Sequence, residues 1–285
     1  MSAILDVDSL SAGYGRIRVV SDVSFTVTQG EVVAIVGRNG AGKTTSLAAV
    51  AGLRYGPCGG SVTVAGVDVT GSSPVRVVRS GLSLVREGRR IFRDMTVLEN
   101  VRLGAFTRRK TKNLGTDLDY VYELFPTLKK YSAKLAGELS GGQQQMVAIG
   151  QALMNRPKFL LLDEPASGLA PAVVEEMYDR LRLLADDGMG VAIVDQSVER
   201  ILRWSDRFYV FESGRTALSG ASESAAVENI NEIILGVVRL KAAGAAPAPS
   251  GRLGDSAQQH EELSHAGRPQ GNDTEQDHKS SRPSS

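Results

Sequence analysis

One glycine-rich stretch constrains this chain more than any other feature: residues 37–44 read Gly-Arg-Asn-Gly-Ala-Gly-Lys-Thr. A short, nearly continuous apolar run precedes it at residues 31–36, and apolar residues recur at helical spacing from residue 43 to about residue 53. Glycines let backbone N–H groups converge on phosphate oxygens, and a following helix directs its positive N-terminal end to the same point. The pattern therefore predicts a phosphate-binding loop between a buried strand and a helix.

The residues of this loop have separable expected roles. Lys43 should reach the β- and γ-phosphates of bound ATP, and the Thr44 hydroxyl should bind Mg²⁺. A chance glycine turn is the alternative, but a strand before the loop and a helix after it favour phosphate binding. The predicted ATP-binding residues of the loop are Gly37, Arg38, Asn39, Gly40, Ala41, Gly42, Lys43, Thr44 and Thr45.

A second apolar run, residues 159–162, ends in the acidic pair Asp163-Glu164. We expect a buried strand that delivers Asp163 beside the metal ion, usually through a bound water. Glu164, one residue further, can polarise the attacking water, because phosphoryl transfer needs a positioned proton acceptor together with charge neutralisation. The alternative is a salt-bridged turn after a core strand. We therefore predict Glu164 and Lys43 as catalytic residues.

The pentad Leu139-Ser140-Gly141-Gly142-Gln143 forms a third motif. A serine and two glycines at a helix start make a good anion site. Such a site is redundant in a chain that already has a phosphate-binding loop, so we expect it to face the γ-phosphate held by a partner subunit. An ordinary capped helix start is the alternative. The predicted residues of this signature are Ser140, Gly141, Gly142 and Gln143.

These three motifs, in this order, resemble those of the ATP-binding-cassette (ABC) ATPases over residues 1 to about 240. The resemblance implies an α/β P-loop NTPase fold with a RecA-like parallel sheet and an antiparallel β subdomain. A helical subdomain, about residues 96–155, carries the signature. It also implies that two such units close head-to-tail over two ATP molecules. Tyr14 matches the aromatic residue that stacks on adenine, and a buried structural tyrosine is the alternative there.

Three positions depart from the family's commonest pattern. Glu87 stands where a loop usually offers a glutamine to the metal, so Glu87 joins Thr44 and Asp163 as a predicted metal ligand. Ala170 replaces a usual aspartate, and Gln196 replaces the histidine that touches the γ-phosphate, which makes Gln196 the third predicted catalytic residue.

These departures resemble one ATPase subunit of branched-chain amino-acid importers, the LivF type. The segments that carry this likeness are Glu-Gly-Arg-Arg-Ile-Phe at residues 87–92, Gly-Leu-Ala-Pro at 168–171 and Asp-Gln at 195–196. The resemblance implies a heterodimer with a second ATPase subunit, two permease subunits and, indirectly, a solute-binding protein. It places the chain peripherally on the cytoplasmic face of the inner membrane. Residues 87–100 should border the groove that receives a permease helix.

Within that segment the expected contacts are Phe92, Met95, Val97 and Leu98, with packing inside the helical subdomain as the alternative. Rival functions are import of urea or short amides, lipid export, a non-transport ABC protein acting on DNA or ribosomes, and a catalytically silent interaction subunit. The last two belong to different functional classes from a transport ATPase. A measured ATPase rate would separate the silent subunit from the others.

Composition narrows these choices. The 33 Lys and Arg residues nearly balance 32 Asp and Glu, which gives no sign of an extended nucleic-acid surface. A basic cluster at residues 108–112 is expected to be a solvated loop. Cys58 is the only cysteine, so an intrachain disulfide or a cysteine metal cluster is impossible, as suits a reducing cytoplasm.

Two further expectations concern membranes and the end of the sequence. The start lacks the features of a signal peptide, and no apolar run approaches the ~18 residues of a membrane helix, so we expect a soluble protein that docks on a membrane partner. Residues 241–285 contain no Phe, Trp or Tyr and hold all three histidines. This composition predicts a disordered tail.

Overall fold

The computed structural model describes residues 4–53, 59–108 and 113–235. The expected tail, 241–285, lies outside these residues. The strands are β1 (Ile4–Tyr14), β2 (Ile17–Thr28), β3 (Val32–Gly37), β4 (Gly59–Val64), β5 (Val67–Asp68), β6 (Leu82–Val85), β7 (Phe159–Asp163), β8 (Gly190–Val194), β9 (Arg207–Glu212) and β10 (Arg215–Ala221). The helices are α1 (Lys43–Val50), α2 (Pro74–Arg79), α3 (Val97–Leu103), α4 (Leu114–Leu124), α5 (Pro126–Lys130), α6 (Gly141–Leu153), α7 (Pro171–Asp186), α8 (Val198–Leu202) and α9 (Val227–Leu235).

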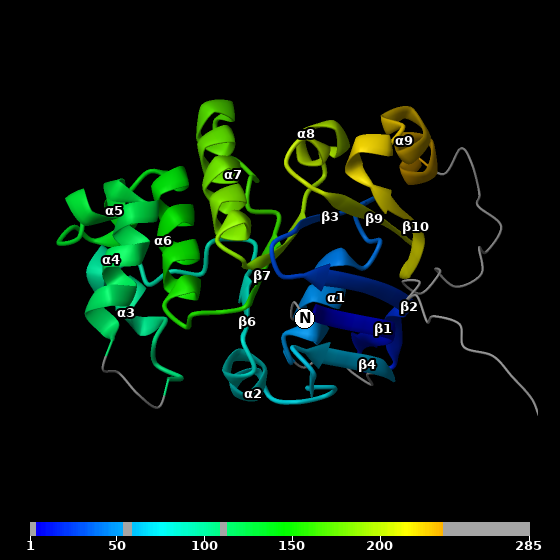
Figure 1. Ribbon diagram of the computed structural model, residues 1–285, viewed down its shortest axis with the longest axis horizontal. Helices are drawn as coiled ribbons and strands as arrows, with labels where there is room; N and C mark the ends of the chain where they lie inside the picture. Colours follow the sequence, from blue (N-terminus) through cyan, green and yellow to red (C-terminus); the bar gives the residue numbers. More distant parts are fainter. Residues whose placement is uncertain (1–3, 54–58, 109–112, 236–285) are drawn as a thin grey trace, which may run out of the picture. The chain divides into compact units, whose positions relative to one another are not determined.

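The strands form one mixed sheet in the order β5-β4-β1-β2-β10-β9-β3-β8-β7-β6. Strands β6, β7, β8, β3 and β9 pair in parallel, whereas β1, β2, β4 and β5 pair antiparallel. β10 is antiparallel to β9 and joins the two parts of the sheet through a short parallel pairing with β2. Figure 1 shows α1 beside the antiparallel strands and α3–α6 grouped beyond β6. The expected parallel core and antiparallel subdomain are confirmed.

The central strand β3 separates two hydrophobic cores. Its six residues are all buried, as the apolar run predicted. Side chains of a strand alternate between its two faces. Val32, Ala34 and Val36 accordingly pack with α6 and α7, whereas Val33 and Ile35 pack with α1 and the antiparallel strands. Burial on both faces fixes the point at which β3 ends and the glycine loop begins.

The helical group α3–α6 begins with a capped helix, α3, and the turn before this helix is held by hydrogen bonds. Thr96 and Glu99 form a reciprocal capping box at the beginning of α3. The buried Asn100 amide donates to the carbonyls of Phe92, Met95 and Thr96, which fixes the preceding turn. Val97 is fully buried in the core of this group, so its prediction as a docking contact is wrong.

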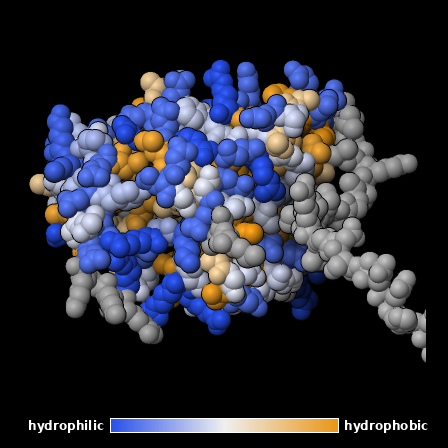
Figure 2. Space-filling view, viewed as in Figure 1, coloured by the Kyte–Doolittle hydropathy of each residue, from blue (hydrophilic) through white to orange (hydrophobic). Residues whose placement is uncertain are grey.

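Some boundaries differ from the sequence-based expectations. Helix α1 ends at Val50, because Gly52 adopts a left-handed backbone with φ 74° that ends the helix before residue 53. The short helices α2 and α8 were not expected, since six and five residues carry little periodic signal. Figure 2 shows a mostly hydrophilic face with small apolar areas near α6 and α9. Every helix in the described residues is too short or too polar to cross a membrane.

A buried ion-pair cluster joins three segments of the helical group. Asp117 in α4 is 5% exposed and accepts hydrogen bonds from Arg108, after α3, and from Arg156, after α6. The expectation that Arg108 belongs to a solvated loop is therefore wrong: its side chain is 18% exposed and paired. Arg156 is half exposed and can reach water. The cluster ties the α3–α4 connection and the α6–β7 connection to helix α4.

We predict that Asp117→Ala lowers the free energy of unfolding by about 2 kcal/mol, because the largely buried Arg108 guanidinium loses its carboxylate. Urea unfolding monitored by circular dichroism measures this value. Asp119→Ala, which removes an exposed carboxylate from the same helix, should change it by less than about 0.5 kcal/mol. Equal effects of the two substitutions would contradict a structural role for the cluster.

Candidate active site

The glycine loop lies at the carboxyl end of β3, as expected. A Cβ at Gly37 would come within 2.3 Å of the Phe211 carbonyl oxygen in β9, so only glycine fits there. Gly42 precedes α1 with φ 99°, a conformation that L side chains rarely adopt. The loop between them can therefore turn back over the start of α1. Binding of phosphate oxygens by the backbone N–H groups of this loop stays a prediction.

Lys43 is held inside this loop. Its side chain is 5% exposed, and its ammonium donates to the carbonyl oxygens of Gly37, at 2.8 Å, and Arg38, at 3.0 Å. An ammonium has three donors, so one remains for a phosphate oxygen. Burial lowers the pKa of Lys43, and the nearby carboxylates, Glu164 first, oppose that shift. The loop thus presents a fixed cation at the start of α1.

Strand register brings the first carboxylate to the loop. Asp163 ends β7 beside Val194, the last residue of β8, which itself pairs with Ile35 in β3. The Thr44 hydroxyl donates to Asp163 Oδ1 at 3.0 Å. Burial, and to a lesser extent the negative charges of Glu164 and Glu87, raise the pKa of Asp163 to about 6, while the hydrogen bond from Thr44 and the charge of Lys43 oppose the shift. Two of the three predicted metal ligands, Thr44 and Asp163, are therefore in contact.

The side chains of Glu164 and Gln196, a carboxylate and an amide, are hydrogen-bonded to each other. Gln196 Nε2 donates to Glu164 Oε2 at 2.7 Å. The Glu164 backbone has φ 47° and its N–H donates to the Val194 carbonyl at 3.1 Å, so the residue is held in a left-handed conformation that costs free energy for a non-glycine residue. The structure thus brings both predicted catalytic residues to the same edge of the sheet as Lys43.

The donor set suits Mg²⁺ bound together with a nucleotide. Within the described ranges, no group of three or more His, Cys, Asp or Glu residues is arranged to hold a metal ion alone. Mg²⁺ in nucleotide sites takes only one or two protein ligands and completes its shell with phosphate oxygens and water. Thr44 and Asp163 fit that pattern. Glu87 is exposed and lies close enough to influence the pKa of Asp163, so its role as a ligand remains a prediction.

Tyr14 lies at the tip of the hairpin formed by β1 and β2, where it pairs with Ile17. Its side chain is 48% exposed, so the alternative of a buried structural tyrosine is wrong. The hairpin comes close to the phosphate-binding loop, because a Cβ at Gly42 would lie 3.2 Å from Val20 Cγ2 in β2. Stacking of the Tyr14 ring on adenine stays a prediction.

The signature begins α6. Ser140 is the N-cap, and it forms a capping box with Gln143. Gly142 is needed because a Cβ there would lie 2.3 Å from Val173 Cγ1 in α7, and a Cβ at Gly141 would lie 2.8 Å from the Arg89 guanidinium. Figure 1 shows α6 and α1 in different parts of the fold. The orientation of the signature towards a partner's nucleotide therefore stays a prediction.

Sequence reasoning missed two side-chain groups near these motifs. Arg89 contacts the signature, with its guanidinium 3.4 Å from Gln144 Oε1. Asp195, just before Gln196, is 3% exposed and accepts a hydrogen bond from Tyr178 in α7. The signal for Asp195 was its position after the apolar strand β8, which is the same signal that identified Asp163. Tyr178 carried no comparable signal, because it occupies an ordinary apolar position of an amphipathic helix.

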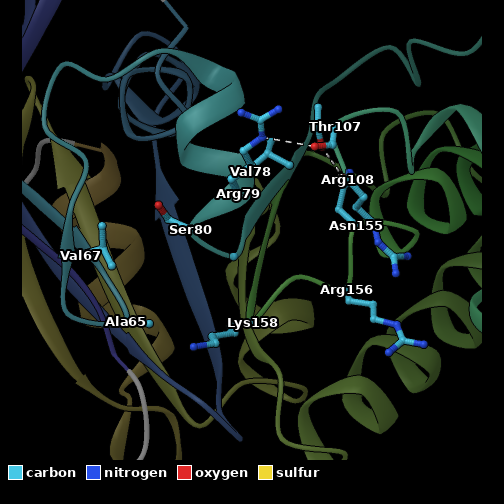
Figure 3. Close-up of a pocket in the computed structure, with 11 residues that line it drawn as sticks. Ala65, Val67, Val78, Arg79, Ser80, Thr107, Arg108, Asn155, Arg156 and Lys158 are labelled. Atoms are coloured by element: carbon cyan, nitrogen blue, oxygen red, sulfur yellow. Dashed lines mark hydrogen bonds between the residues drawn. The ribbon is translucent and has the colours of Figure 1, made fainter. Parts of the chain in front are cut away.

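A separate cavity of about 750 Å³ lies between the β4–β5 turn and the base of the helical group (Figure 3). Its lining is basic, but much of that charge is already used: Arg108 and Arg156 pair with Asp117, and Arg79 Nε donates to the Thr107 carbonyl at 3.3 Å. In Figure 3 the Arg108 and Arg156 side chains point towards the helices. Because these arginines already have partners, the cavity is a weaker candidate for an anion site than the glycine loop.

We predict that Asp163→Asn stabilises the nucleotide-free protein at alkaline pH. The pKa of Asp163 is about 6 in the folded protein and 3.8 in the unfolded chain, so ionisation costs the folded state up to about 3 kcal/mol above pH 6. This cost disappears as the pH falls below about 4, where the carboxyl is protonated in both states. Urea unfolding between pH 4 and 8 with EDTA should show a gain that grows with pH. A pH-independent gain, or the same gain for the exposed control Asp179→Asn, would contradict the assignment.

Comparison with known proteins shows similarity to ATP-binding proteins of transport systems. The chain is 40% identical over 215 residues to the high-affinity branched-chain amino acid transport ATP-binding protein BraG of Pseudomonas aeruginosa, which covers 75% of this chain and 91% of BraG. It is 33% identical over 231 residues to a probable branched-chain amino acid transport ATP-binding protein, LivF, of Archaeoglobus fulgidus, with 80% and 97% covered. The lipopolysaccharide export ATP-binding protein LptB of Haemophilus influenzae is 32% identical over 237 residues, with 82% and 98% covered.

Solved structures agree with the fold. An ATP-binding cassette of an ABC transporter in its ADP conformation superposes with a TM-score of 0.71 at 26% identity, covering 82% of this chain and 95% of that one. A nucleotide-free cassette gives a TM-score of 0.70 at 26% identity, covering 83% and 96%. Residues 20–167 match the ABC transporter family. With its phosphate-binding loop, strand-end carboxylates and signature helix in the family's order, this chain belongs to the ABC transporter family of ATP-binding subunits.

Proposed function

We propose that the chain is the ATP-hydrolysing subunit of an importer for branched-chain or related amino acids. The observation that carries the proposal is the convergence of Lys43, Thr44, Asp163, Glu164 and Gln196 at one edge of the sheet. This arrangement supplies a phosphate-binding cation, a metal-binding pair and a carboxylate held by an amide. The 40% identity to BraG, a branched-chain amino acid transport protein, supports the substrate class.

In the proposed mechanism the glycine loop and Lys43 hold the β- and γ-phosphates of ATP, while the exposed Tyr14 ring stacks on the base. Thr44 and Asp163, with Glu87 nearby, hold Mg²⁺, which neutralises charge on the phosphates when bound. Glu164 accepts a proton from the attacking water. Gln196 keeps the Glu164 carboxylate in place and, as a neutral amide, can also donate to a phosphate oxygen.

We assign residues 1–240 to the ATPase domain and about 96–155 to its helical subdomain. The helix start at Ser140–Gln143 serves the nucleotide of a second ATPase subunit, since one chain has no use for two phosphate sites on one nucleotide. Closing and reopening of this pair move two permease subunits. The chain is then peripheral to the cytoplasmic face of the inner membrane, and a solute-binding protein delivers the amino acid from the other side.

A groove between β6 and the helical group is the proposed docking surface for a permease helix. It has a volume of about 360 Å³, and the residues that line it include Leu84, Val85, Leu103, Phe106, Ala148 and Gln151. Phe106 is 87% exposed, an unusual state for a phenylalanine unless a partner covers it. Phe92, from the predicted docking segment, is 57% exposed. Sequence reasoning had identified Phe92 but not Phe106.

Export of a glycolipid is the second candidate, because LptB is 32% identical with 98% of its length covered. The higher identity to BraG favours amino-acid uptake. Reconstitution of the chain with its cognate second ATPase subunit and permeases in proteoliposomes separates the two functions. ATP-dependent accumulation of labelled leucine supports uptake, and an ATPase that responds to lipid but moves no amino acid contradicts it.

We predict that Glu164→Gln lowers ATP turnover by about 10²–10⁴-fold, because the amide cannot accept the proton of water. ATP binding should persist, so the variant should form a long-lived ATP-bound dimer detectable by size-exclusion chromatography. Glu176→Gln, an exposed glutamate of α7, should keep the activity of the parent. Normal turnover in Glu164→Gln would remove Glu164 as the proton acceptor.

We predict that Phe106→Asp uncouples ATP hydrolysis from transport, because a charged side chain cannot be buried against an apolar permease helix. Phe92→Asp should have the same effect. Uptake of labelled leucine in proteoliposomes should fall about tenfold or more while ATPase activity of the isolated ATPase pair stays within about twofold. Leu183→Asp, at a 48% exposed position of α7, is the matched control. Unchanged uptake in both phenylalanine variants would contradict this docking surface.

A further inference from the structure

A cluster of two buried side chains and one partly exposed arginine lies beside the active site and has no part in the mechanism given above. It consists of Tyr178 in α7, Asp195 after β8, and Arg200 in α8. Tyr178 is 1% and Asp195 is 3% exposed. These residues come from three elements and meet directly before Gln196. Their position raises the question of what the cluster holds in place.

The cluster fixes the short loop that carries Gln196. The Asp195 carboxylate accepts a hydrogen bond from the Ser197 backbone N–H at 2.8 Å. A terminal nitrogen of Arg200 donates to its two oxygens at 2.8 and 3.1 Å, and the Tyr178 hydroxyl donates to Oδ2. Asp195 therefore binds the backbone on the far side of Gln196, while Tyr178 and Arg200 prevent the carboxylate from rotating.

The same loop reaches the predicted proton acceptor. Gln196 donates to Glu164 Oε2 at 2.7 Å, and the Glu164 N–H donates to the carbonyl of Val194 at 3.1 Å. Glu164 is thus held from both sides by residues 194–196. Because Glu164 is in a left-handed conformation at φ 47°, its carboxylate depends on such contacts to keep its direction.

The cluster is poorly suited to serve stability alone. The Asp195 carboxylate is 3% exposed and loses most of its hydration, whereas the Arg200 side chain is 40% exposed and compensates that loss only in part. Arg200 Nε is in addition a buried donor without a partner in the part of the chain that the structure describes. A group that costs free energy in this way and adjoins an active site is a candidate for a positioning role.

We propose that Tyr178, Asp195 and Arg200 are positioning residues that fix Gln196 and, through it, the Glu164 carboxylate. This inference rests on the proposed function, in which Glu164 activates water. It also gives α7 a role, because Val173 of α7 packs against the signature residue Gly142 and Tyr178 of the same helix binds Asp195. Helix α7 thereby connects the signature, which serves the partner's nucleotide, with the carboxylate that serves the chain's own nucleotide.

Hydrogen–deuterium exchange on the purified chain tests the positioning directly. Tyr178→Phe removes one hydroxyl and leaves the ring in place. Exchange in the peptide that contains Ser197 should become about fivefold faster, as expected for the weakening of one hydrogen bond, while the strands β3 and β7 keep their protection. The control Tyr120→Phe removes a comparable 3.3 Å hydrogen bond to Asp187 and should leave this peptide unchanged. Faster exchange throughout the chain would mean a purely structural role and would overturn the proposal.

Kinetics of the ATPase pair give the second readout. In Tyr178→Phe, kcat should fall about tenfold while KM for ATP stays within about twofold, since the phosphate-binding loop is untouched. Tyr120→Phe should match the parent in both values. A kcat for Tyr178→Phe equal to that of Tyr120→Phe would overturn the proposal.

Glu164→Gln, measured in the same assay, separates failure of this inference from failure of the proposed function. If Glu164→Gln retains turnover, or the pair has no ATPase activity, the proposed function fails, and the exchange experiment still decides whether the cluster fixes residues 195–197. If Glu164→Gln abolishes turnover and Tyr178→Phe matches its control, the proposed function stands and only the positioning role is lost.

Discussion

The complete burial of β3 is the constraint on which the rest of the site depends. Its neighbours β8 and β9 lie on either side of it in parallel, so the carboxyl ends of these strands and of β7 meet at one edge of the sheet. Apolar side chains on both faces of β3 leave no freedom to shift its register, because a shift by one residue would exchange the two faces. The pairing of the strands therefore brings three features to the same edge of the sheet: the glycine loop, the acidic pair at the end of β7 and the amide after β8.

At this edge of the sheet, the buried cation Lys43 lies among several carboxylates, and their charges determine the electrostatics of the site. Lys43 is nearly inaccessible, and its charge is supported by Glu164, Asp163 and Asp195. Those carboxylates repel one another, which is part of the reason that the pKa of Asp163 rises to about 6. In the proposed mechanism, Mg²⁺ held by Thr44 and Asp163 would favour the ionised form of Asp163. Nucleotide binding and the ionisation of the site are in this way linked.

The sequence predicted most of the backbone elements and the chemistry at their ends. Asp163 could be found because it ends a short apolar run of strand length, whereas Gln196 was predicted only from the resemblance to the family and Asp195 was missed. The glycine loop could be found because its spacing reflects backbone conformations that other residues avoid, as the φ of 99° at Gly42 shows. Patterns of this kind report local structure, and local structure is what a sequence encodes most directly.

Contacts between distant segments could not be predicted in the same way. Val97 and Phe92 look alike as apolar residues in one segment, but the turn fixed by Asn100 buries the first and exposes the second. Arg108 lies in a basic run that is typical of a solvated loop, yet α4 brings Asp117 to it. In each case the outcome depends on where another element packs, and neither periodicity nor composition contains that information.

The replacement of a histidine by Gln196 is best understood together with the residues around it. A histidine at position 196 would gain or lose a proton near neutral pH. An amide instead donates the same kind of hydrogen bond at every physiological pH. An amide, however, lacks the charge that would draw it to the carboxylate, so its orientation has to come from the surrounding structure. The ion pair of Asp195 and Arg200 supplies that orientation while adding little net charge, because each partner neutralises the other. The neutral Gln196 therefore binds the Glu164 carboxylate, and the ion pair of Asp195 and Arg200 holds Gln196 in the orientation that this hydrogen bond requires.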